Sequence, residues 1–301
     1  MHKIKRKRSL RYYSTEFGFK AKFDAMASPC EILINSDDKT IAEQVAQAVA
    51  NEAWRIEDKF SRYLPSSTCS KINASNGHAV AIDTETFKLL EFSKQCFIIS
   101  DAAFDITSGV LRHAWNFDGS ANIPKQSKIS ALLPNVGFDK VELTEDSITL
   151  KPGMEIDLGG LGKEYAVDTS LQLIKKITNI PVLINFGGDI AVTGRQVSGQ
   201  PWSVGIEHPS FESKQPLLVS ISSGAIATSG DARRYIIHNG QRYSHVLDPK
   251  TGWSVLNGPQ SITVAAPNCI QAGFVATLAL LQGKNAEQYL DEQEIDHWCV
   301  W

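Results

Sequence analysis

The sequence predicts an α+β protein, and three observations support that prediction. Segments with helical periodicity and segments with strand character alternate irregularly along the 301 residues, without the steady βαβ rhythm of a doubly wound sheet. No short repeat recurs either, and both observations favour α+β over a doubly wound sheet. Hydrophobic residues make up 43% of the chain and charged residues 21%, which is typical of a soluble globular protein. The length suffices for one large domain or for two fused lobes.

The first part of the chain predicts extended structure followed by two helices. The chain is extended from Phe19 to Asn35, where "CEILIN" is the clearest strand segment. Residues 38–60 then form a helix for which Asp37 or Asp38 is the N-cap. Its apolar side chains form one stripe: Ile41, Val45, Val49, Ile56 and Phe60. The polar loop "SRYLPSSTCSKINASNG" separates this helix from a second one around residues 84–99.

The middle of the chain contains two glycine pairs beside apolar segments. "VGFDKVELTEDSITL" predicts a hairpin, and "SITLKPGMEI" alternates like a strand around a turn at Pro152-Gly153. The glycine-rich stretch "DLGGLGK" follows at residues 157–163. The helix after it carries Tyr165, Val167, Leu171 and Ile174 at helical spacing. "VLINFGGDIAVTG" then predicts a buried strand that ends in the second glycine pair.

The last third of the chain is predicted to be mainly strands and turns, closed by one helix. "WSVGIEHP", "LLVSISSGAIATSG", "RRYIIHNGQRYSHVLDPKTG" and "SITVAAP" are the strand-like segments. Within them, "HNGQ" is a hairpin signal, because an Asn-Gly pair suits a type I′ turn. "IQAGFVATLALLQG" predicts a final apolar helix.

Charge and cysteine usage indicate a cytoplasmic protein without nucleic-acid partners or membrane insertion. The net charge of −3 gives no global field that would recruit nucleic acid. The basic run "KIKRKR" predicts a solvated, disordered tail over residues 1–18, since neither an apolar h-region nor a lipid-attachment cysteine accompanies it. No apolar run is long enough to span a membrane. The five scattered cysteines contain no CxxC pair and predict reduced, buried thiols.

The stretch "DLGGLGK" is a candidate anion-binding turn. Glycines between a strand and a helix let the backbone approach a ligand and aim N–H groups at it, which suits a phosphate. A tight structural turn is the alternative for a glycine pair taken alone. The spacing fits neither the Walker pattern nor G-x-G-x-x-G, so neither standard nucleotide fold is indicated.

His245 is a candidate catalytic residue in "RYSHVLDPKTG". It is predicted to lie on a strand that ends at a Pro-Lys-Thr-Gly turn, three residues before Asp248. A structural histidine on a strand is the alternative, and Asp248 before Pro249 is equally well explained as a turn former. The residues alone leave both alternatives open.

Nine segments in order along the chain resemble one family, the FAD:protein FMN transferases, also called the ApbE family. The resemblance runs from about Met26 to about Gly283. Its markers are "DAMAS", "SRYLPSS", "AAFDIT", "DLGGLGKEYAVD", "INFGGDIAVTG", "PWSVGIEHP", "AIATSGD", "SHVLDPKTG" and "SITVAAP". Several co-linear motifs make a much stronger signal than any single glycine pair.

The resemblance implies a two-lobed α+β fold that binds FAD between the lobes, with residues 19–301 as one FMN transferase domain of two intertwined lobes. Such enzymes split the FAD pyrophosphate, attach FMN through a phosphoester to a threonine of an acceptor flavoprotein, and release AMP. The chemistry consists mostly of positioning and of neutralising phosphate charge.

The resemblance also implies roles for individual residues. His245 would orient the attacking threonine or take its proton, and a histidine pKa of about 6.5 suits that task. A magnesium ion would bind the backbone carbonyl of Gly160 and the side chain of Thr277. The residues implied in FAD contact are Met26, Tyr63, Ala103, Phe104, Asp105, Asp157, Lys163 and Leu247.

Two positions depart from the family pattern. The family usually has an aspartate that ligates the metal four residues before the threonine, and this chain has Gly273 there. The family usually has glycine after the lysine, and this chain has Glu164. One hypothesis is that Glu164 replaces the missing carboxylate; the simpler alternative is a solvated first-turn carboxylate that interacts with the helix dipole.

We therefore expect a cytoplasmic, magnesium-dependent FMN transferase. Two alternative functions stay open. In the first, the chain is a flavin-binding carrier that has lost transfer, which Gly273 favours. In the second, it is an FAD pyrophosphatase in which water replaces the acceptor threonine. An intact His245, Asp157 and Thr277 favour the transferase.

Overall fold

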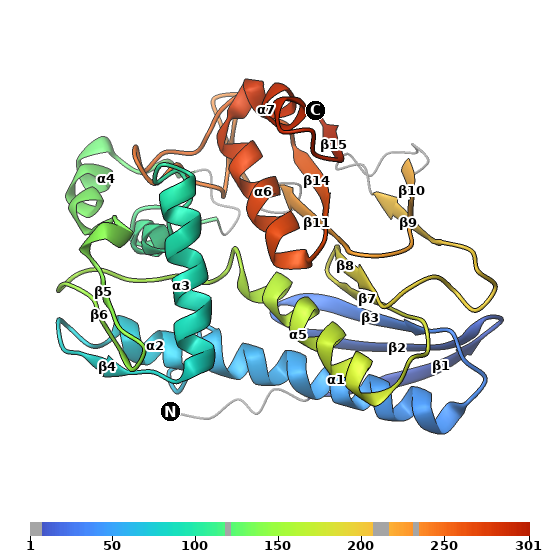
Figure 1. Cartoon of the computed structure of the whole chain (residues 1–301). Helices are drawn as coiled ribbons and strands as arrows, with labels where there is room; N and C mark the ends of the chain where they lie inside the picture. Colours follow the sequence, from blue (N-terminus) through green and yellow to red (C-terminus); the bar gives the residue numbers. More distant parts are fainter. Residues whose placement is uncertain (1–7, 118–121, 207–216, 231–234) are drawn as a thin grey trace.

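The centre of the fold is an antiparallel sheet of eight strands (Figure 1). The computed structural model describes residues 8–117, 122–206, 217–230 and 235–301. Along the sheet the strands are ordered β1-β2-β3-β7-β8-β11-β14-β15, and every adjacent pair is antiparallel. Their bounds are Arg11–Thr15, Gly18–Ala25, Ser28–Ile34, Val182–Phe186, Asp189–Val192, Ala225–Gly230, Ser261–Ala266 and His297–Val300.

Apolar layers cover both faces of this sheet. The largest core cluster joins one face to the buried sides of α1, α5 and α6, which are Lys39–Phe60, Gly162–Ile177 and Cys269–Leu281. The opposite face packs on the hairpin of β9 (Trp202–Ile206) and β10 (Leu217–Ile221). Neighbouring residues of β7 divide between the two layers, with Ile184 in the first and Leu183 in the second, as the two-residue period of a strand requires.

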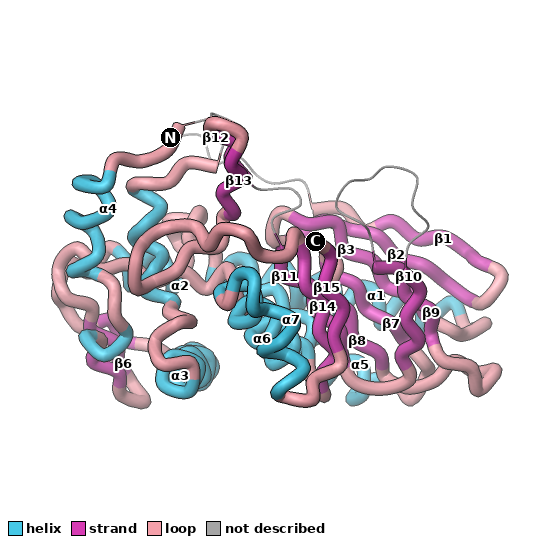
Figure 2. Tube along the Cα trace, turned by 90° about the horizontal axis from the view of Figure 1, so that it is seen from above, coloured by secondary structure: helices cyan, strands magenta, loops and turns pink. Residues whose placement is uncertain are grey.

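A second region, built mainly from helices and turns, lies beside the sheet in both views (Figures 1 and 2). This second region contains a small sheet of order β4-β6-β5. A third apolar cluster joins the helices and turns of the second region to the β12–β13 hairpin. The bounds are α2 Thr68–Asn73, β4 Val80–Ala81, α3 Thr84–Ile99, α4 Gln126–Leu132, β5 Glu142–Leu143, β6 Ser147–Thr149, β12 Tyr235–His238 and β13 Gln241–Ser244. Single 3₁₀ segments occur at Ile106–His113, Leu133–Asn135 and Phe138–Lys140. A further 3₁₀ segment, Gly283–Asn285, and helix α7, Ala286–Glu292, follow α6 along the chain.

The chain passes repeatedly between the two regions. It leaves the sheet region after α1, returns at α5, contributes β12 and β13 to the second region, and ends with β14, α6, α7 and β15 at the sheet (Figure 2). Helices and strands therefore mix as the sequence predicts, and the α+β assignment is confirmed. Within the described part of the chain, every helix is too short or too polar to cross a membrane.

The predicted helices are present, and Asp38 caps the first of them as predicted. Helix α1 begins after Asp38, whose carboxylate accepts the N–H groups of Thr40 and Ile41 at 2.9 and 3.2 Å. Helix α3 begins after Asp83, which accepts the Thr86 N–H at 2.9 Å. The "HNGQ" hairpin is also confirmed, because Asn239 and Gly240 have φ of 51° and 76°, as a type I′ turn requires.

Three predictions are corrected. "VLINFGGDIAVTG" forms two paired strands, because Gly187 and Gly188 have φ of 62° and 103° and turn the chain between β7 and β8. In "SITLKPGMEI" only Ser147–Thr149 is a strand. The predicted tail over residues 1–18 extends too far, since Arg11–Thr15 pairs with β2 as strand β1. Residues 1–7 of that tail lie outside the described residues.

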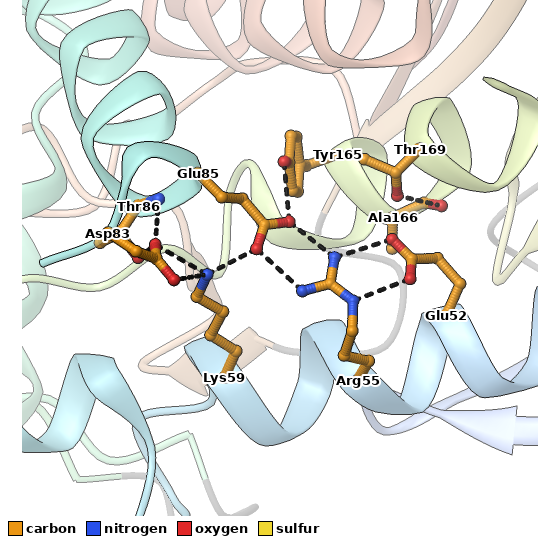
Figure 3. Close-up of polar contacts among 9 residues, drawn as sticks. All are labelled: Glu52, Arg55, Lys59, Asp83, Glu85, Thr86, Tyr165, Ala166 and Thr169. Carbon is orange, nitrogen blue, oxygen red and sulfur yellow. Dashed lines mark hydrogen bonds and ion pairs between the residues drawn. The ribbon is translucent and has the colours of Figure 1, made fainter. Parts of the chain in front are cut away.

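A polar network ties α1, α3 and α5 together (Figure 3). The Arg55 guanidinium of α1 donates to both carboxylate oxygens of Glu85 on α3, at 2.8 and 2.6 Å. Lys59 and the Tyr165 hydroxyl of α5 also donate to Glu85, at 2.5 and 3.0 Å. The hydrogen bonds from Arg55, aided by those from Lys59 and Tyr165, outweigh partial burial and lower the pKa of Glu85 to about 2.

Glu85→Gln should lower the free energy of unfolding by about 1–2 kcal/mol at pH 7, because charged hydrogen bonds to Arg55 and Lys59 are lost. A lowered carboxylate pKa contributes stability that is complete above its ordinary value of 4.5 and is lost as the pH falls towards about 2. The difference between variant and wild type should therefore shrink between pH 7 and pH 3 in urea unfolding. Glu91→Gln on the same helix is the control and should change little; a pH-independent difference for Glu85→Gln contradicts the prediction.

Candidate functional site

The glycine-rich turn before α5 presents exposed backbone at the start of a helix. The Leu158 carbonyl accepts the N–H groups of Leu161 and Gly162 at 3.0 and 2.7 Å, and Asp157 Oδ1 accepts the Gly159 N–H at 2.9 Å. Gly159 and Gly160 are exposed, and Leu161 at the N-cap has no polar side chain to offer the first turn. The positive end of a helix dipole and nearby backbone N–H groups favour an anionic group such as a phosphate.

Arg62 connects Tyr63 and Asp157, two residues implied in FAD contact. Its Nη1 forms an ion pair with Asp157 Oδ2 at 2.7 Å, and its Nη2 donates to the Tyr63 hydroxyl at 2.9 Å. The guanidinium carbon lies 5.0 Å from the centroid of the Tyr63 ring, which is 68% exposed. Arg62 was not predicted as a site residue. Its position beside Tyr63 in "SRYLPSS" was the available signal.

Asp105 acts as a structural cap in this protein. Its Oδ1 accepts the Thr107 N–H and hydroxyl at 2.8 and 2.7 Å, and its Oδ2 accepts the Phe138 N–H at 3.2 Å. Burial raises the pKa of this carboxyl group, although these hydrogen bonds oppose the shift. Any contact of Asp105 with FAD must therefore coexist with the cap. The neighbouring Ala103 packs against the main core.

Phe104 links the second region to α6 and to the glycine-rich turn. Its ring packs edge-to-face on Phe274, with the centroids 5.3 Å apart. A Cβ built on Gly160 would lie 3.8 Å from Phe104 Cε2. Gly160 and Phe274 of α6 therefore both lie close to one buried aromatic ring.

Lys163 is held by a buried carboxylate on the sheet. Its ammonium forms an ion pair with Asp189 Oδ2 on β8, and Asp189 Oδ1 accepts the Thr228 N–H at 3.3 Å. Asp189 is 0% exposed and the Lys163 side chain 22% exposed. Burial by itself would lower the pKa of Lys163, but the carboxylates of Asp189 and Glu164 outweigh it and raise that pKa. Lys163 therefore stays charged and positioned.

The turn at Met26 lies beside the turn at Gly187. Met26 has φ of 52°, and its N–H donates to Glu57 Oε1 at 3.1 Å. A Cβ on Gly187 would lie 2.7 Å from Ser28 Cβ and 3.9 Å from Lys163 Cδ. Only glycine leaves room for this approach, which brings the β2–β3 turn, the β7–β8 turn and Lys163 together.

Thr277 and Gly273 lie one helical turn apart on α6 and so share a face of that helix. The Thr277 hydroxyl is 3.1 Å from the Ser229 hydroxyl of β11. Asp168 of α5 caps α6 by accepting the N–H groups of Cys269 and Ile270 at 2.8 and 2.9 Å. This cap, which the sequence analysis did not identify, fixes α6 relative to α5.

His245 directly follows β13 rather than lying within a strand. Its ring packs edge-to-face on Phe117 with the centroids 6.3 Å apart, and Leu247 forms an isolated β-bridge with Ser254. Asp248 is confirmed as a turn former, since its carboxylate accepts the Lys250 N–H at 2.8 Å and the Thr251 hydroxyl at 2.9 Å.

Comparison with known proteins identifies the family. A family model described as the ApbE family matches residues 26–299. The chain belongs to the ApbE family. An FAD:protein FMN transferase of Klebsiella pneumoniae is 29% identical over 261 residues, covering 84% of this chain and 79% of the relative. One of Chlamydia muridarum is 28% identical over 285 residues, covering 92% and 88%.

Solved structures agree with this ApbE assignment. The crystal structure of an ApbE protein from Thermotoga maritima is 28% identical and superimposes with a TM-score of 0.85, covering 96% of this chain and 94% of the other. The flavinyl transferase ApbE of Pseudomonas stutzeri, at 23% identity and a TM-score of 0.80 over 97% and 90% of the two chains, shares the fold.

Most of the residues that the ApbE resemblance implies fall into three sets and one further segment. Tyr63 and Asp157 meet through Arg62. The turn that carries Met26 lies beside Lys163 through the Gly187 turn. A third set gathers around α6 and the glycine-rich turn, and a fourth segment, just after β13, carries two more of these residues. The third set is Phe104, Gly160 and Thr277, and the fourth segment carries His245 and Leu247.

Asp189→Asn should lower the free energy of unfolding by about 3–5 kcal/mol, because it leaves the largely buried Lys163 without its partner. The double variant Lys163→Met with Asp189→Asn should lose less than the sum of the two single losses, since neither charge is then stranded. Urea unfolding measures all three variants. Asp37→Asn, which changes an exposed carboxylate at a loop, is the control; strictly additive losses would refute the coupling.

Proposed function

We propose that this ApbE protein is an FAD:protein FMN transferase. It splits the pyrophosphate of FAD, attaches FMN through a phosphoester to a threonine of an acceptor flavoprotein, and releases AMP. The observation that carries the proposal is the family match over residues 26–299, together with relatives named for this activity. The exposed turn at the start of α5, with Lys163 fixed beside it, supports a phosphate-binding role.

A divalent cation fits the residues that are present, and we take it to be Mg²⁺. Glu164 Oε2 is buried and has no hydrogen-bond partner within the described residues, so the site contains an oxygen that calls for a cation or a proton. The carbonyl of Gly160 and the hydroxyl of Thr277 are hard oxygen donors of the kind Mg²⁺ prefers. When bound, the ion would neutralise charge on the pyrophosphate oxygens.

The chain's own residues would then bind and orient FAD. The contacts proposed are those of the turn at Met26, the Tyr63 ring, the segment from Ala103 to Asp105, and Leu247. Asp157 presents an acceptor for the adenine or ribose, and Lys163 offsets phosphate charge.

His245 would handle the proton of the acceptor threonine. The threonine oxygen forms a bond to the phosphorus of the FMN half, and the bond from that phosphorus to the bridging oxygen breaks, which leaves AMP. The hydroxyl proton passes to a His245 nitrogen, and AMP departs with the electron pair of the broken bond. A histidine serves because its ordinary pKa lies close to neutral pH.

We also place the protein in the cytoplasm. Support comes from its thiols: all five cysteines are free, and Cys30, Cys69, Cys96 and Cys269 are buried. Reduced cysteines suit a reducing compartment. Cell fractionation tests this proposal, and recovery from an extracytoplasmic fraction would contradict it.

The proposed reaction is separated from its rivals by product analysis. The purified chain is incubated with FAD and Mg²⁺, with and without an acceptor chosen from proteins that carry covalent flavin only in cells with this gene. Transfer gives AMP and covalent flavin fluorescence on the acceptor, and both depend on the acceptor. AMP and free FMN without acceptor indicate an FAD pyrophosphatase, and FAD binding with neither product indicates a flavin carrier.

His245→Ala should slow FMN transfer by about 10²–10⁴-fold, because a positioned general base is lost. Its affinity for FAD should stay near that of wild type, since the change removes no proposed FAD contact. Single-turnover flavin fluorescence and FAD titration measure the two quantities. His238→Ala, which changes a histidine of β12, is the comparison; normal turnover by His245→Ala would exclude His245 from catalysis.

The protein should bind FAD more tightly than FMN. Asp157 and Asp105 are proposed to address the AMP half, which FMN lacks. Flavin fluorescence titration in the presence of Mg²⁺ compares the two dissociation constants. Equal affinities would contradict the pocket as proposed, and Asp157→Asn should reduce the preference for FAD if the assignment is right.

A further inference from the structure

Glu164 occupies the space in which a side chain at position 273 would lie. A Cβ built on Gly273 would lie 2.6 Å from Glu164 Cγ, 2.8 Å from Oε1 and 3.0 Å from Cδ. Any residue larger than glycine at position 273 therefore requires Glu164 to move. The two positions at which the chain departs from the ApbE pattern are in direct contact across α5 and α6.

The carboxylate of Glu164 is buried, contrary to the simpler alternative of a solvated first-turn carboxylate. The residue is 8% exposed, and its Oε2 has no hydrogen-bond partner within the part of the chain that the structure describes. A buried carboxylate oxygen without a partner is unfavourable unless a cation or a proton joins it. The helix dipole alone does not account for this burial.

The charges around Glu164 leave it without a cation of its own. Lys163 forms its ion pair with Asp189, and Asp168 is engaged in capping α6. Burial, and then the negative charge of Asp189, raise the pKa of Glu164 to about 7, although Lys163 opposes the shift. Asp189 and Glu164 thus share one lysine, a balance that favours one more positive charge.

The other oxygen donors of the proposed cation site lie on the segments that Glu164 joins. Gly160 precedes it in the turn that opens α5, and Phe104 packs both on that turn and on Phe274. Thr277 lies on the same face of α6 as Gly273, one turn further along. The Glu164 side chain runs from the first of these segments to the second.

We propose that Glu164 is a ligand of the divalent cation, and that it delivers from α5 the carboxylate that Gly273 lacks on α6. The proposal rests on the proposed function, since it concerns the cation that accompanies FAD. Gly273 contributes by leaving the space that the Glu164 side chain fills. Compared with the usual ApbE pattern, the carboxylate therefore comes from α5 instead of α6, and position 273 on α6 is a glycine.

Binding of Mn²⁺ to the full chain tests the proposal without reference to turnover. Electron paramagnetic resonance measures free Mn²⁺ during titration, with and without FAD. Glu164→Gln should weaken Mn²⁺ binding by about 10-fold or more, because a charged ligand becomes neutral. Glu31→Gln on β3 is the matched control and should bind Mn²⁺ as wild type does. Melting temperatures in EDTA establish that each variant is folded.

A rescue variant separates a ligand from a merely structural side chain. Glu164→Gly should weaken Mn²⁺ binding at least as much as Glu164→Gln, and adding Gly273→Asp should restore it to within about 3-fold of wild type. Gly273→Ala alone should weaken binding by displacing Glu164, whereas the same change in the Glu164→Gly background should have little effect. A purely steric role for Glu164 predicts that Glu164→Gln binds Mn²⁺ normally.

The outcomes distinguish a failure of the Glu164 proposal from a failure of the proposed function. If the wild type transfers FMN but Glu164→Gln keeps wild-type affinity for Mn²⁺, Glu164 is a buried protonated acid and the proposal is wrong. If Mn²⁺ affinity depends on Glu164 and is restored by Gly273→Asp, yet the wild type forms no flavinylated product, the cation assignment stands and the transferase assignment fails. Absence of Mn²⁺ binding to the wild type, with FAD present, overturns the proposal.

Discussion

The ion pair between Lys163 and Asp189 fixes the start of helix α5, and the geometry of the site depends on that position. Asp189 is fully buried at the first residue of β8, directly after the Gly187-Gly188 turn. A carboxylate so placed is stable only with a charged partner, and Lys163 is within reach because α5 begins at Gly162. The sheet thereby determines where the glycine-rich turn presents its backbone.

Two further contacts make α5 a rigid support. At one end, the Tyr165 hydroxyl joins the Arg55–Glu85 pair, which ties α5 to α1 and α3 (Figure 3). In its middle, Asp168 caps α6. Each contact is a charged or buried hydrogen bond, whose loss leaves an unsatisfied group and so is costly. Residues from three helices and the sheet are therefore positioned by a single helix, which suits chemistry that consists mainly of holding phosphates in place.

This arrangement also depends on two glycines, whose lack of a side chain lets neighbouring groups approach. Gly187 allows the β2–β3 turn and Lys163 to approach the β7–β8 turn, and Gly273 leaves room for Glu164 between α5 and α6. At both positions a Cβ would come within 3 Å of a neighbouring side-chain atom. Close packing of a core makes such spaces specific, because neighbours rarely relax enough to accept an added methyl group.

The sequence by itself determined the local elements and the family. Helix α1 was predictable because apolar residues recur at helical spacing after Asp38, and a capping carboxylate acts within three residues of its own position. The ApbE motifs were readable for the same reason, since each is a short continuous stretch. Arg62 and Asp189 both lie inside ApbE motifs. The place of Arg62 beside Tyr63 is a local signal, whereas nothing local distinguishes Asp189 from a surface charge.

Only the tertiary structure decided that Glu164 is buried. A glutamate in the first turn of a helix is ordinarily solvated, and neither its neighbours nor its spacing indicate that α6 covers it. Its burial follows from the packing of α6 on α5 and from the absence of a side chain at Gly273, which is distant in the sequence. The single strand predicted for "VLINFGGDIAVTG" failed for a related reason. Whether a glycine pair ends a strand or reverses it depends on which partner strand is available for pairing, and that is a property of the whole sheet.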